Sequence, residues 1–396
     1  MARQRHECGD VSDRSSLMIR VLHVIDHLGL GGAQTALLDM LKQRDQEEFE
    51  VEVAVMHGRG PFADELEKLG LRVHVLSRAK WPPAYVPALV ALVRRGNFQV
   101  LHFHLQGSNW LAKPLAALAG GGTCIAHDHT SGDLKFRGVG SLVPDAVSHL
   151  FSSRVLAVSE GVRDFLMRWE AVPRDRITVI PNGINVAEFR PATVTEKIAA
   201  RRRWGIPHDA FVAGGMGRLA YEKNFALLPE LATRHPGVHF VVAGSGPEKD
   251  ALAAQAARLG VGDRMRFLGA VSERAEFYRA LDVFLLPSLY EGLPMAVLEA
   301  MASGLPVLSS RLEGIAAALS DEKEGLLAPA GDLAAFAGQL ARLTDSPALR
   351  AQLGAAARIR VENSYSAADT ASRIEAVYRH EVAIANGGPA AKSSPQ

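Results

Sequence analysis

The sequence predicts an α/β protein built from two doubly wound, Rossmann-like domains. Short apolar runs alternate with segments of helical pattern along most of the chain, which is typical of parallel sheets covered by helices. The alternation occurs in two series that are separated by a turn-rich stretch. With 396 residues, 48% of them hydrophobic, the chain is long enough for two domains of about 180 residues, each with its own core.

Seven strand-like runs form the first series. They lie at 19–25, 49–57, 72–77, 98–104, 123–129, 153–159 and 177–181. Segments of helical pattern fill the connections, as at 33–43 and 86–96. Because successive parallel strands need a crossover connection, helices are expected on both faces of the sheet. A turn-rich, irregular sequence makes 177–191 the best candidate for a linker between domains.

Six further runs form the second series. They lie at 211–218, 238–246, 265–271, 282–288, 305–310 and 324–330. Residues after Asp345 are mainly helical in pattern, and 366–385 has an apolar rhythm of 3.6 residues. The predicted domains are therefore 18–190 and 191–365. The polar ends, 1–17 and 386–396, are expected to be a disordered lead and tail.

Composition argues against several classes of function. A formal net charge of +1 does not suit a dedicated nucleic-acid binder. The two cysteines, Cys8 and Cys124, have no metal-type spacing, so a reducing cytoplasmic location without disulfides is expected. No apolar run reaches the length of a membrane-spanning helix, and the first residues lack the apolar core of a signal peptide.

One stretch of the first half carries only positive charge. No acidic residue lies between Glu67 and Asp128. Seven cations interleave there with five aromatic residues: Lys68, Arg72, Arg78, Lys80, Arg94, Arg95 and Lys113, with Trp81, Tyr85, Phe98, Phe103 and Trp110. Two interpretations remain open. The charges are either scattered and solvated, or they form a basic face that docks on anionic lipid at the inner side of the cell membrane or on a phosphate-bearing acceptor.

Two glutamates flank a predicted helix start within 282–310. Pro294 suits the first position of that helix. Three amides would lie near its positive end, where an anionic or strongly polar ligand is favoured: those of Gly292, Leu293 and Met295. Glu291 precedes the helix, and Glu299 lies within the helix, eight residues after Glu291. At 100° per residue this spacing is about 80° beyond two full turns, so the two carboxylates can reach different parts of one long ligand.

Two cations follow the first strand of the second series. Arg218 and Lys223 lie five residues apart in a loop that begins at Gly217. A guanidinium and an ammonium at this spacing can reach both phosphoryl groups of a diphosphate. An exposed basic loop is the alternative. Ligands of doubly wound sheets bind beyond the carboxyl ends of the strands, which is where this loop is expected.

Glycine-rich turns follow two other strands. The first contains Gly31 and Gly32, and the second contains Gly244 and Gly246. Such turns either present backbone N–H groups to phosphate or serve only tight turning and close packing. The second turn departs from the full dinucleotide fingerprint, so no nicotinamide cofactor is expected.

Four histidines alternate on two predicted strand ends. They are His102 and His104, then His127 and His129. Alternate residues of a strand share a face, so each pair can present two imidazoles together. A metal site also needs an arrangement in space that spacing alone does not establish, and no metal is expected from the sequence.

The segment with Glu291 and Glu299 resembles the Glu-x7-Glu element of retaining glycosyltransferases of the family-four type, and the loop with Arg218 and Lys223 is similar to a second signature of that family. This resemblance implies the GT-B fold, in which two Rossmann-like domains face each other across a cleft and the last helix crosses back onto the first domain. It implies transfer of a hexosyl unit from a nucleotide-diphosphate sugar, with a UDP-sugar favoured. The implied acceptor is a glycan, a lipid-linked or a small molecule, in cell-surface polysaccharide or glycoconjugate biosynthesis.

The resemblance also implies roles for single residues. Arg218 and Lys223 would stabilise the departing diphosphate, Glu291 would contact the donor sugar and Glu299 would hold the ribose. His129 matches the family's active-site histidine, with His127 as the alternative. The implied donor-binding residues are Gly31, Gly32, Gly217, Gly244, Gly246, Leu268, Gly292, Leu293, Pro294, Met295 and Glu299. Ser159 and Glu160 either border the cleft or simply cap and begin a helix.

No metal or cofactor is implied besides the co-substrate. No nucleophile is evident in the sequence, which suits a front-face mechanism in which the leaving diphosphate accepts the acceptor's proton. Two other functions remain open on the same scaffold. A sugar-nucleotide epimerase would need an acid and a base carboxylate at the sugar. A catalytically silent nucleotide-sugar-binding subunit would be expected to lack Arg218, Lys223 or Glu299, all of which are present.

Overall fold

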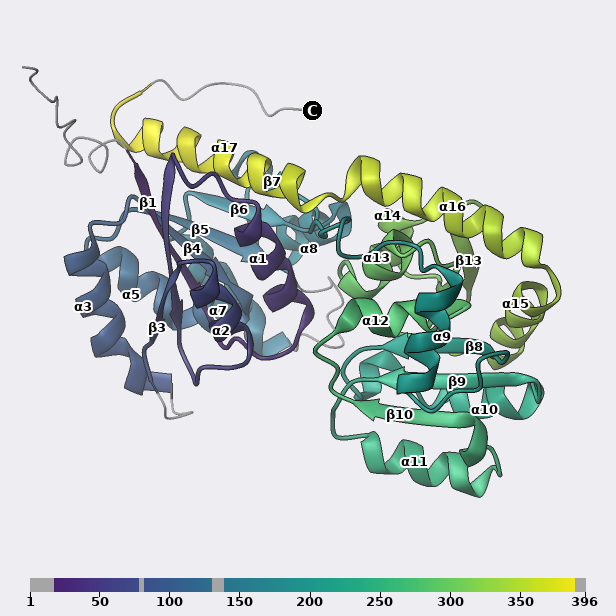
Figure 1. The fold of residues 1–396 in the computed structure, drawn as a ribbon. Coiled ribbons are helices and arrows are strands. Elements are labelled where there is room, and N and C mark those ends of the chain that lie inside the picture. The colour runs from purple at the N-terminus through teal and green to yellow at the C-terminus, as the bar shows by residue number, and fades with distance from the viewer. Residues whose placement is uncertain (1–17, 78–81, 130–138, 389–396) are drawn as a thin grey trace, which may run out of the picture.

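The computed structural model describes residues 18–77, 82–129 and 139–388 (Figure 1). The predicted lead, 1–17, and residues 389–396 of the predicted tail at 386–396 lie outside the described residues. Two parallel sheets, each covered by helices, form two α/β domains. The predicted fold class is therefore confirmed.

The first sheet has seven parallel strands in the order β3-β2-β1-β4-β5-β6-β7. They are β1 Ile19–Ile25, β2 Phe49–Val55, β3 Arg72–Val75, β4 Val100–His104, β5 Thr123–Asp128, β6 Arg154–Ala157 and β7 Ile177–Val179. Successive residues of a strand point to opposite faces. In β1, Val21 and Ile25 therefore enter one core, while Leu22 and Val24 enter another on the far face.

Helices cover both faces of this sheet (Figure 1). One core is closed by α1 Gly32–Lys42, α2 Phe62–Lys68 and the C-terminal α17 Ala367–Ala385. The other is closed by α3 Val86–Gly96 and α5 Lys113–Leu118. The remaining helical segments of this half are η1 Pro82–Tyr85, α4 Leu105–Gly107, η2 Ser108–Ala112, α7 Val139–His149, α8 Glu160–Trp169 and η3 Arg174–Arg176.

The second sheet has six parallel strands in the order β10-β9-β8-β11-β12-β13. They are β8 Phe211–Met216, β9 Val238–Ala243, β10 Met265–Gly269, β11 Val283–Leu286, β12 Val307–Ser310 and β13 Gly325–Ala328. Its helical segments are α9 Val194–Arg203, η4 Tyr221–Lys223, α10 Leu227–Arg234, α11 Lys249–Arg258, η5 Gly262–Arg264, α12 Arg274–Arg279, α13 Met295–Ala302, α14 Glu313–Ala318, α15 Leu333–Asp345 and α16 Pro347–Ser364.

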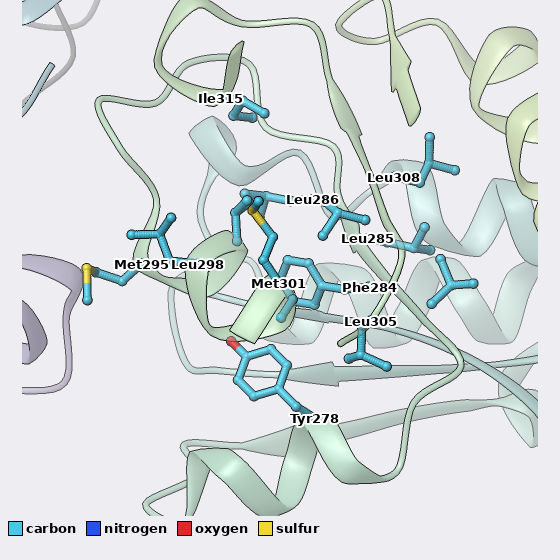
Figure 2. Close-up of a cluster of buried hydrophobic side chains, with 14 of the residues drawn as sticks. Tyr278, Phe284, Leu285, Leu286, Met295, Leu298, Met301, Leu305, Leu308 and Ile315 are labelled. Carbon is cyan, nitrogen blue, oxygen red and sulfur yellow. The ribbon is translucent and has the colours of Figure 1, made fainter. Parts of the chain in front are cut away.

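Helix α13 lies inside the core of the second domain. Leu298 and Met301 pack there among side chains of the strands and of neighbouring helices, such as Phe284 and Tyr278 (Figure 2). A short helix with apolar residues around most of its surface must be buried, as the composition of 295–302 indicates. Its first turn is consequently held in a fixed position at the edge of the sheet.

The chain crosses between the domains twice, and the two crossings run side by side. Ile184 in the predicted linker accepts a hydrogen bond from Ala367 N (3.0 Å) and donates one to Tyr365 O (2.8 Å). Beyond that point α17 lies across the first domain (Figure 1), where Tyr378 is buried against residues of the first sheet. The C-terminal helix thus becomes part of the first domain's core.

One of the seven cations in the acid-free stretch at 68–126 is not on the surface. Lys113 is fully buried, and its Nζ donates to Ser152 Oγ at 2.8 Å. Burial lowers the pKa of Lys113 to about 7. Three of the aromatic residues, Tyr85, Phe98 and Phe103, belong to the core, because they close the apolar face beneath α3 and α5. Arg78, Lys80 and Trp81 lie outside the described residues.

Candidate functional site

A cavity of about 710 Å³ lies between the two domains, a size typical of small-molecule sites. Loops that follow β1, β8, β9 and β11 line it, together with residues that follow β2, β4, β5, β7 and β10. In both sheets the strand order reverses beside the first strand of the domain, between β1 and β4 and between β8 and β11. Loops diverge at such a point and leave a crevice at the carboxyl ends of the strands.

Most of the predicted site residues line this cavity. They are Gly31, Gly32, His129, Gly217, Arg218, Lys223, Gly244, Gly246, Glu291, Gly292, Leu293, Pro294, Met295 and Glu299. Leu268 does not line it. The pairing of β10 with β9 shifts register between Phe267 and Gly269, and the next residues, Ala270 and Val271, face the cavity instead. Donor binding by Leu268 stays a prediction.

The ends of β8 and β11 are tied together by hydrogen bonds. Lys223 Nζ lies 2.5 Å from Glu291 Oε1, and Ser288 Oγ donates to the same carboxylate oxygen at 2.6 Å. Leu289 N donates to the carbonyl of Glu222 at 2.8 Å. The ammonium and the carboxylate that were predicted to serve the donor are therefore neighbours.

Arg218 is the exposed member of the cation pair. Its side chain is 67% exposed, and its Nε lies 2.9 Å from Glu222 Oε1. An exposed ion pair of this kind contributes little to stability, so the guanidinium can exchange Glu222 for a phosphate without a large energetic loss. The fork of donors suits a phosphoryl group better than a point charge does.

Glu299, unlike Arg218, is a buried charged residue. It is 2% exposed, pairs with Arg274 and accepts a hydrogen bond from the hydroxyl of Tyr278 at 2.8 Å. Burial raises the pKa of Glu299, while Arg274 and Tyr278 act against that shift. A buried carboxylate with two fixed partners keeps one geometry, which is what recognition of a sugar hydroxyl requires.

The helix that carries Glu299 begins one residue later than predicted. Pro294 is the N-cap of α13, with φ −74° and ψ 116°, and Met295 is the first helical residue. The proline ring allows this φ in both an extended and a helical residue, so the pattern could not distinguish the two positions. The residues at the start of α13 still line the cavity.

Two glycines allow the loops after β8 and β9 to touch. A Cβ at Gly244, whose φ is +143°, would lie 1.8 Å from the carbonyl oxygen of Gly217, and one at Gly246 would lie 2.2 Å from that of Leu219. Any larger residue would push the two loops apart. Close backbone approach therefore explains this Gly-x-Gly turn, whether or not its N–H groups also contact a phosphate.

Sequence reasoning missed several cavity residues. The most informative is Arg274, the partner of Glu299. Arg274 is the first residue of α12, where the helix dipole disfavours a cation. This unfavourable position is the sequence signal that could have indicated that Arg274 has a buried anionic partner. Asn182 was taken as a turn residue, but it is buried, lines the cavity and hydrogen-bonds His129.

Ser159 and Glu160 do not line the cavity. Ser159 Oγ accepts from Val162 N at 3.3 Å and caps α8, whose first residue is Glu160. The capping interpretation of this pair is the one that the structure supports.

Comparison with known proteins identifies the family. Residues 30–188 match Glycosyltransferase Family 4, and residues 196–360 match Glycosyl transferases group 1. The chain is 31% identical over 306 residues to the putative glycosyltransferase EpsF of Bacillus subtilis, which covers 74% of this chain and 79% of that protein. The chain belongs to the glycosyltransferases.

Other similarities extend over nearly the whole chain. It is 25% identical to the UDP-Gal:alpha-D-GlcNAc-diphosphoundecaprenol alpha-1,3-galactosyltransferase of Escherichia coli over 91% of this chain and 96% of that protein. The crystal structure of Anabaena HepE in complex with UDP-glucose superposes with a TM-score of 0.83 at 19% identity, and covers 91% of this chain and 99% of that one. The glycosyltransferase therefore has the GT-B fold, as predicted.

Proposed function

We propose that this glycosyltransferase moves a hexosyl unit from a UDP-sugar to an acceptor, with retention of anomeric configuration and without a divalent metal. The observation that carries the proposal is the pair formed by Lys223 and Glu291 at the strand-order reversal, with Arg218 beside it. One group of the pair suits a diphosphate and the other suits sugar hydroxyls. The UDP-galactose in the name of the galactosyltransferase relative and the UDP-glucose in the similar structure favour uridine as the base.

The carboxylates of the cavity support a front-face reaction. Three of them line it within the described residues, and each is paired with a cation: Glu222 with Arg218, Glu291 with Lys223 and Glu299 with Arg274. A covalent nucleophile or an epimerase base would need a carboxylate that is free to attack or to accept a proton. These three are instead arranged to hold cations and hydroxyls in place.

In the proposed step the bond from the anomeric carbon to the diphosphate oxygen breaks. The acceptor oxygen forms its bond to the same face of that carbon, and its proton passes to the departing diphosphate. Arg218 and Lys223 stabilise the negative charge that grows on the diphosphate, and Glu291 positions the sugar. His129 lines the cavity, and burial lowers its pKa to about 4, so it acts as a neutral hydrogen-bonding group.

The acceptor is proposed to be a glycan or a lipid-linked sugar of cell-surface polysaccharide or glycoconjugate biosynthesis. Relatives named for a diphosphoundecaprenol-linked sugar and for the lipopolysaccharide core of Rhizobium meliloti support this class. No helix among the described residues is long and apolar enough to cross a membrane. Peripheral contact with the membrane is proposed for reaching a lipid-linked acceptor.

The first domain offers a surface for such contact. Arg94 and Arg95 are exposed in the last turn of α3, which packs against α5. Apolar side chains are exposed on α5, η2 and α7 of the same domain: Trp110, Leu111, Leu118, Val143 and Val147. Basic residues beside exposed apolar ones suit a membrane with anionic lipid.

The direct test is a panel of UDP-, GDP- and ADP-sugars offered to the protein with candidate acceptors. Mass spectrometry would follow release of the nucleoside diphosphate and the mass of the product, and NMR would give the anomeric configuration of the new bond. Turnover with a UDP-sugar and a retained configuration are expected. If no donor released its nucleoside diphosphate, the proposed transfer would be overturned. A product of inverted anomeric configuration would overturn the front-face step.

A further inference from the structure

Five histidines gather on one face of the first sheet, beside the donor cavity. β1 contributes His23, β4 contributes His102 and His104, and β5 together with the residue after it contributes His127 and His129. Strand register brings them together, because His23 pairs with His102 and His104 pairs with His127. The histidines that were expected to share a face within each strand thus share one face across three neighbouring strands.

The cluster divides into two parts by hydrogen bonding. On the inner side a chain of contacts runs through Tyr378 of α17: its hydroxyl lies 2.5 Å from His102 Nδ1 and 3.5 Å from His23 Nε2. His23 Nδ1 lies 2.8 Å from His104 Nε2. These contacts fix the orientation of the inner rings and leave His104 Nδ1 directed toward the cavity side.

On the cavity side three ring nitrogens lack a hydrogen-bond partner among the described residues, although Asn182 hydrogen-bonds His129. His127 is 3% exposed, and neither of its ring nitrogens has a hydrogen-bond partner among the described residues. Nδ1 of His129 is also unpartnered, although its Nε2 lies 3.4 Å from His104 Nδ1. A neutral imidazole always carries one N–H donor and one acceptor, so a buried ring without partners is costly unless something else binds it.

We propose that His104, His127 and His129 form a binding site for a divalent first-row transition metal, with Zn²⁺ the best fit. One ligand nitrogen from each of the three lies within 4.8 Å of the other two. The 3.4 Å between His104 and His129 is about the separation of two nitrogens bound to one tetrahedral Zn²⁺ at about 2.0–2.1 Å. Three imidazoles with a fourth position open are a common ligand set for this ion.

The inner histidines favour the site. A metal-bound imidazole usually donates from its other nitrogen to a fixed acceptor, and His23 provides that contact for His104.

The ion would act on the glycosyltransferase through His129. That residue lines the donor cavity, whereas His104 and His127 do not. A metal bound at its ring would hold it away from a sugar or an acceptor, so occupancy is expected to inhibit transfer and not to support it. The proposed metal site is separate from the diphosphate site, where Arg218 and Lys223 supply the positive charge.

The test uses the full chain without a polyhistidine tag, stripped with EDTA and dialysed. Calorimetry with ZnCl₂ is expected to give one equivalent bound, and Co²⁺ is expected to give the intense visible absorption of a tetrahedral site. His127→Gln should weaken Zn²⁺ binding by at least the 10–100-fold that loss of an outer partner causes. His235→Gln is the matched control. His235 Nε2 is also unpartnered, but His235 lies in the second domain and belongs to no group of possible metal ligands among the described residues. This variant should bind Zn²⁺ as tightly as the wild type.

Three outcomes would overturn the site: no stoichiometric binding, equal affinity in His127→Gln, or a Co²⁺ spectrum no stronger than that of the hydrated ion. If circular dichroism shows that His127→Gln is unfolded, His129→Gln replaces it in the same titration. The Co²⁺ spectrum of the wild type needs no variant. Because every readout is binding to the protein alone, the result does not depend on which donor or acceptor the glycosyltransferase uses.

Discussion

Lys223 Nζ lies 2.5 Å from Glu291 Oε1, although the two residues are 68 positions apart and follow different strands. They meet because β8 and β11 are neighbours at the point where the strand order reverses. A ligand that enters there meets a cation and a carboxylate already in register with each other. Preorganisation of this kind is what electrostatic catalysis requires, since no group has to reorient as charge develops.

Replacing Arg218 or Lys223 by Ala should lower the transfer rate by about 10²-fold or more, as expected when a preorganised charge partner of the leaving group is lost. Single-turnover rates with saturating donor measure this effect. Lys323→Ala, which removes an exposed cation of the same domain, should leave the rate unchanged. Wild-type turnover in both site variants would contradict the assignment of these two cations.

Glu299 and Glu291 should have separable effects on binding and transfer. Glu299→Gln should weaken binding of UDP alone by about 10–100-fold, because a hydrogen bond to a charged group contributes about 1.5–3 kcal/mol. Glu291→Gln should leave UDP binding nearly intact and impair transfer. Calorimetry with UDP and the transfer assay distinguish the two, and an equal loss of UDP affinity in both variants would contradict the proposed roles.

Glutamine is the substitution of choice at position 299 for a structural reason. Glu299→Ala would leave Arg274 buried without its partner, and breaking a buried ion pair in this way costs about 3–5 kcal/mol. Loss of UDP binding in that variant would then report unfolding as much as recognition. Gln also removes the charge that faces Arg274, but it retains the volume and an amide oxygen that can accept a hydrogen bond from Tyr278.

The sequence predicted the positions of the strands well, because each buried parallel strand is a short apolar run bounded by turns. It also placed the loops of the site, since carboxyl ends of parallel strands meet at one edge of a sheet. It did not reveal Arg274 as the partner of Glu299 or the burial of Lys113. Both depend on which side chains from distant segments meet, and no local pattern records that.

Transfer should continue in excess EDTA. The diphosphate's negative charge is expected to be balanced by Arg218 and Lys223, which line the cavity and would supply the positive charge that a magnesium ion supplies in metal-dependent enzymes. Initial rates with and without EDTA, and after addition of Mg²⁺ or Mn²⁺, measure the requirement. Activity that disappears in EDTA and returns with either ion would reject metal-independent transfer.

Binding to anionic vesicles should depend on Arg94 and Arg95. Each exposed basic residue near such a surface contributes about 1 kcal/mol, and salt screens the attraction. Co-sedimentation with and without anionic lipid should therefore show binding that falls at high salt and in the double variant Arg94→Glu, Arg95→Glu. The double variant Arg234→Glu, Arg258→Glu in the second domain should bind like the wild type. Binding that changes neither with salt nor in the variant Arg94→Glu, Arg95→Glu would favour the interpretation that the charges are scattered over the surface.

Asp39 should make the protein less stable as pH rises from about 4 to 7. It is fully buried on α1, neither carboxylate oxygen has a hydrogen bond among the described residues, and Lys42 Nζ is 3.9 Å away. Burial raises its pKa from 3.8 to about 7, against the opposing influence of Arg274 and Lys42. Between these pH values the unfolded chain has released the proton while the folded chain retains it, so folding becomes less favourable, by about 4 kcal/mol at full ionisation.

Asp39→Asn cannot ionise and should escape this loss. The Tm of the variant minus that of the wild type should therefore be several degrees more positive at pH 8 than at pH 5, where the wild type has lost only part of its stability. Asp64→Asn, which changes an exposed carboxylate of the same domain, should show no such pH-dependent difference. A Tm difference for Asp39→Asn that is equal at both pH values would mean that Asp39 is already ionised in the folded protein at pH 5, with Arg274 and Lys42 outweighing its burial.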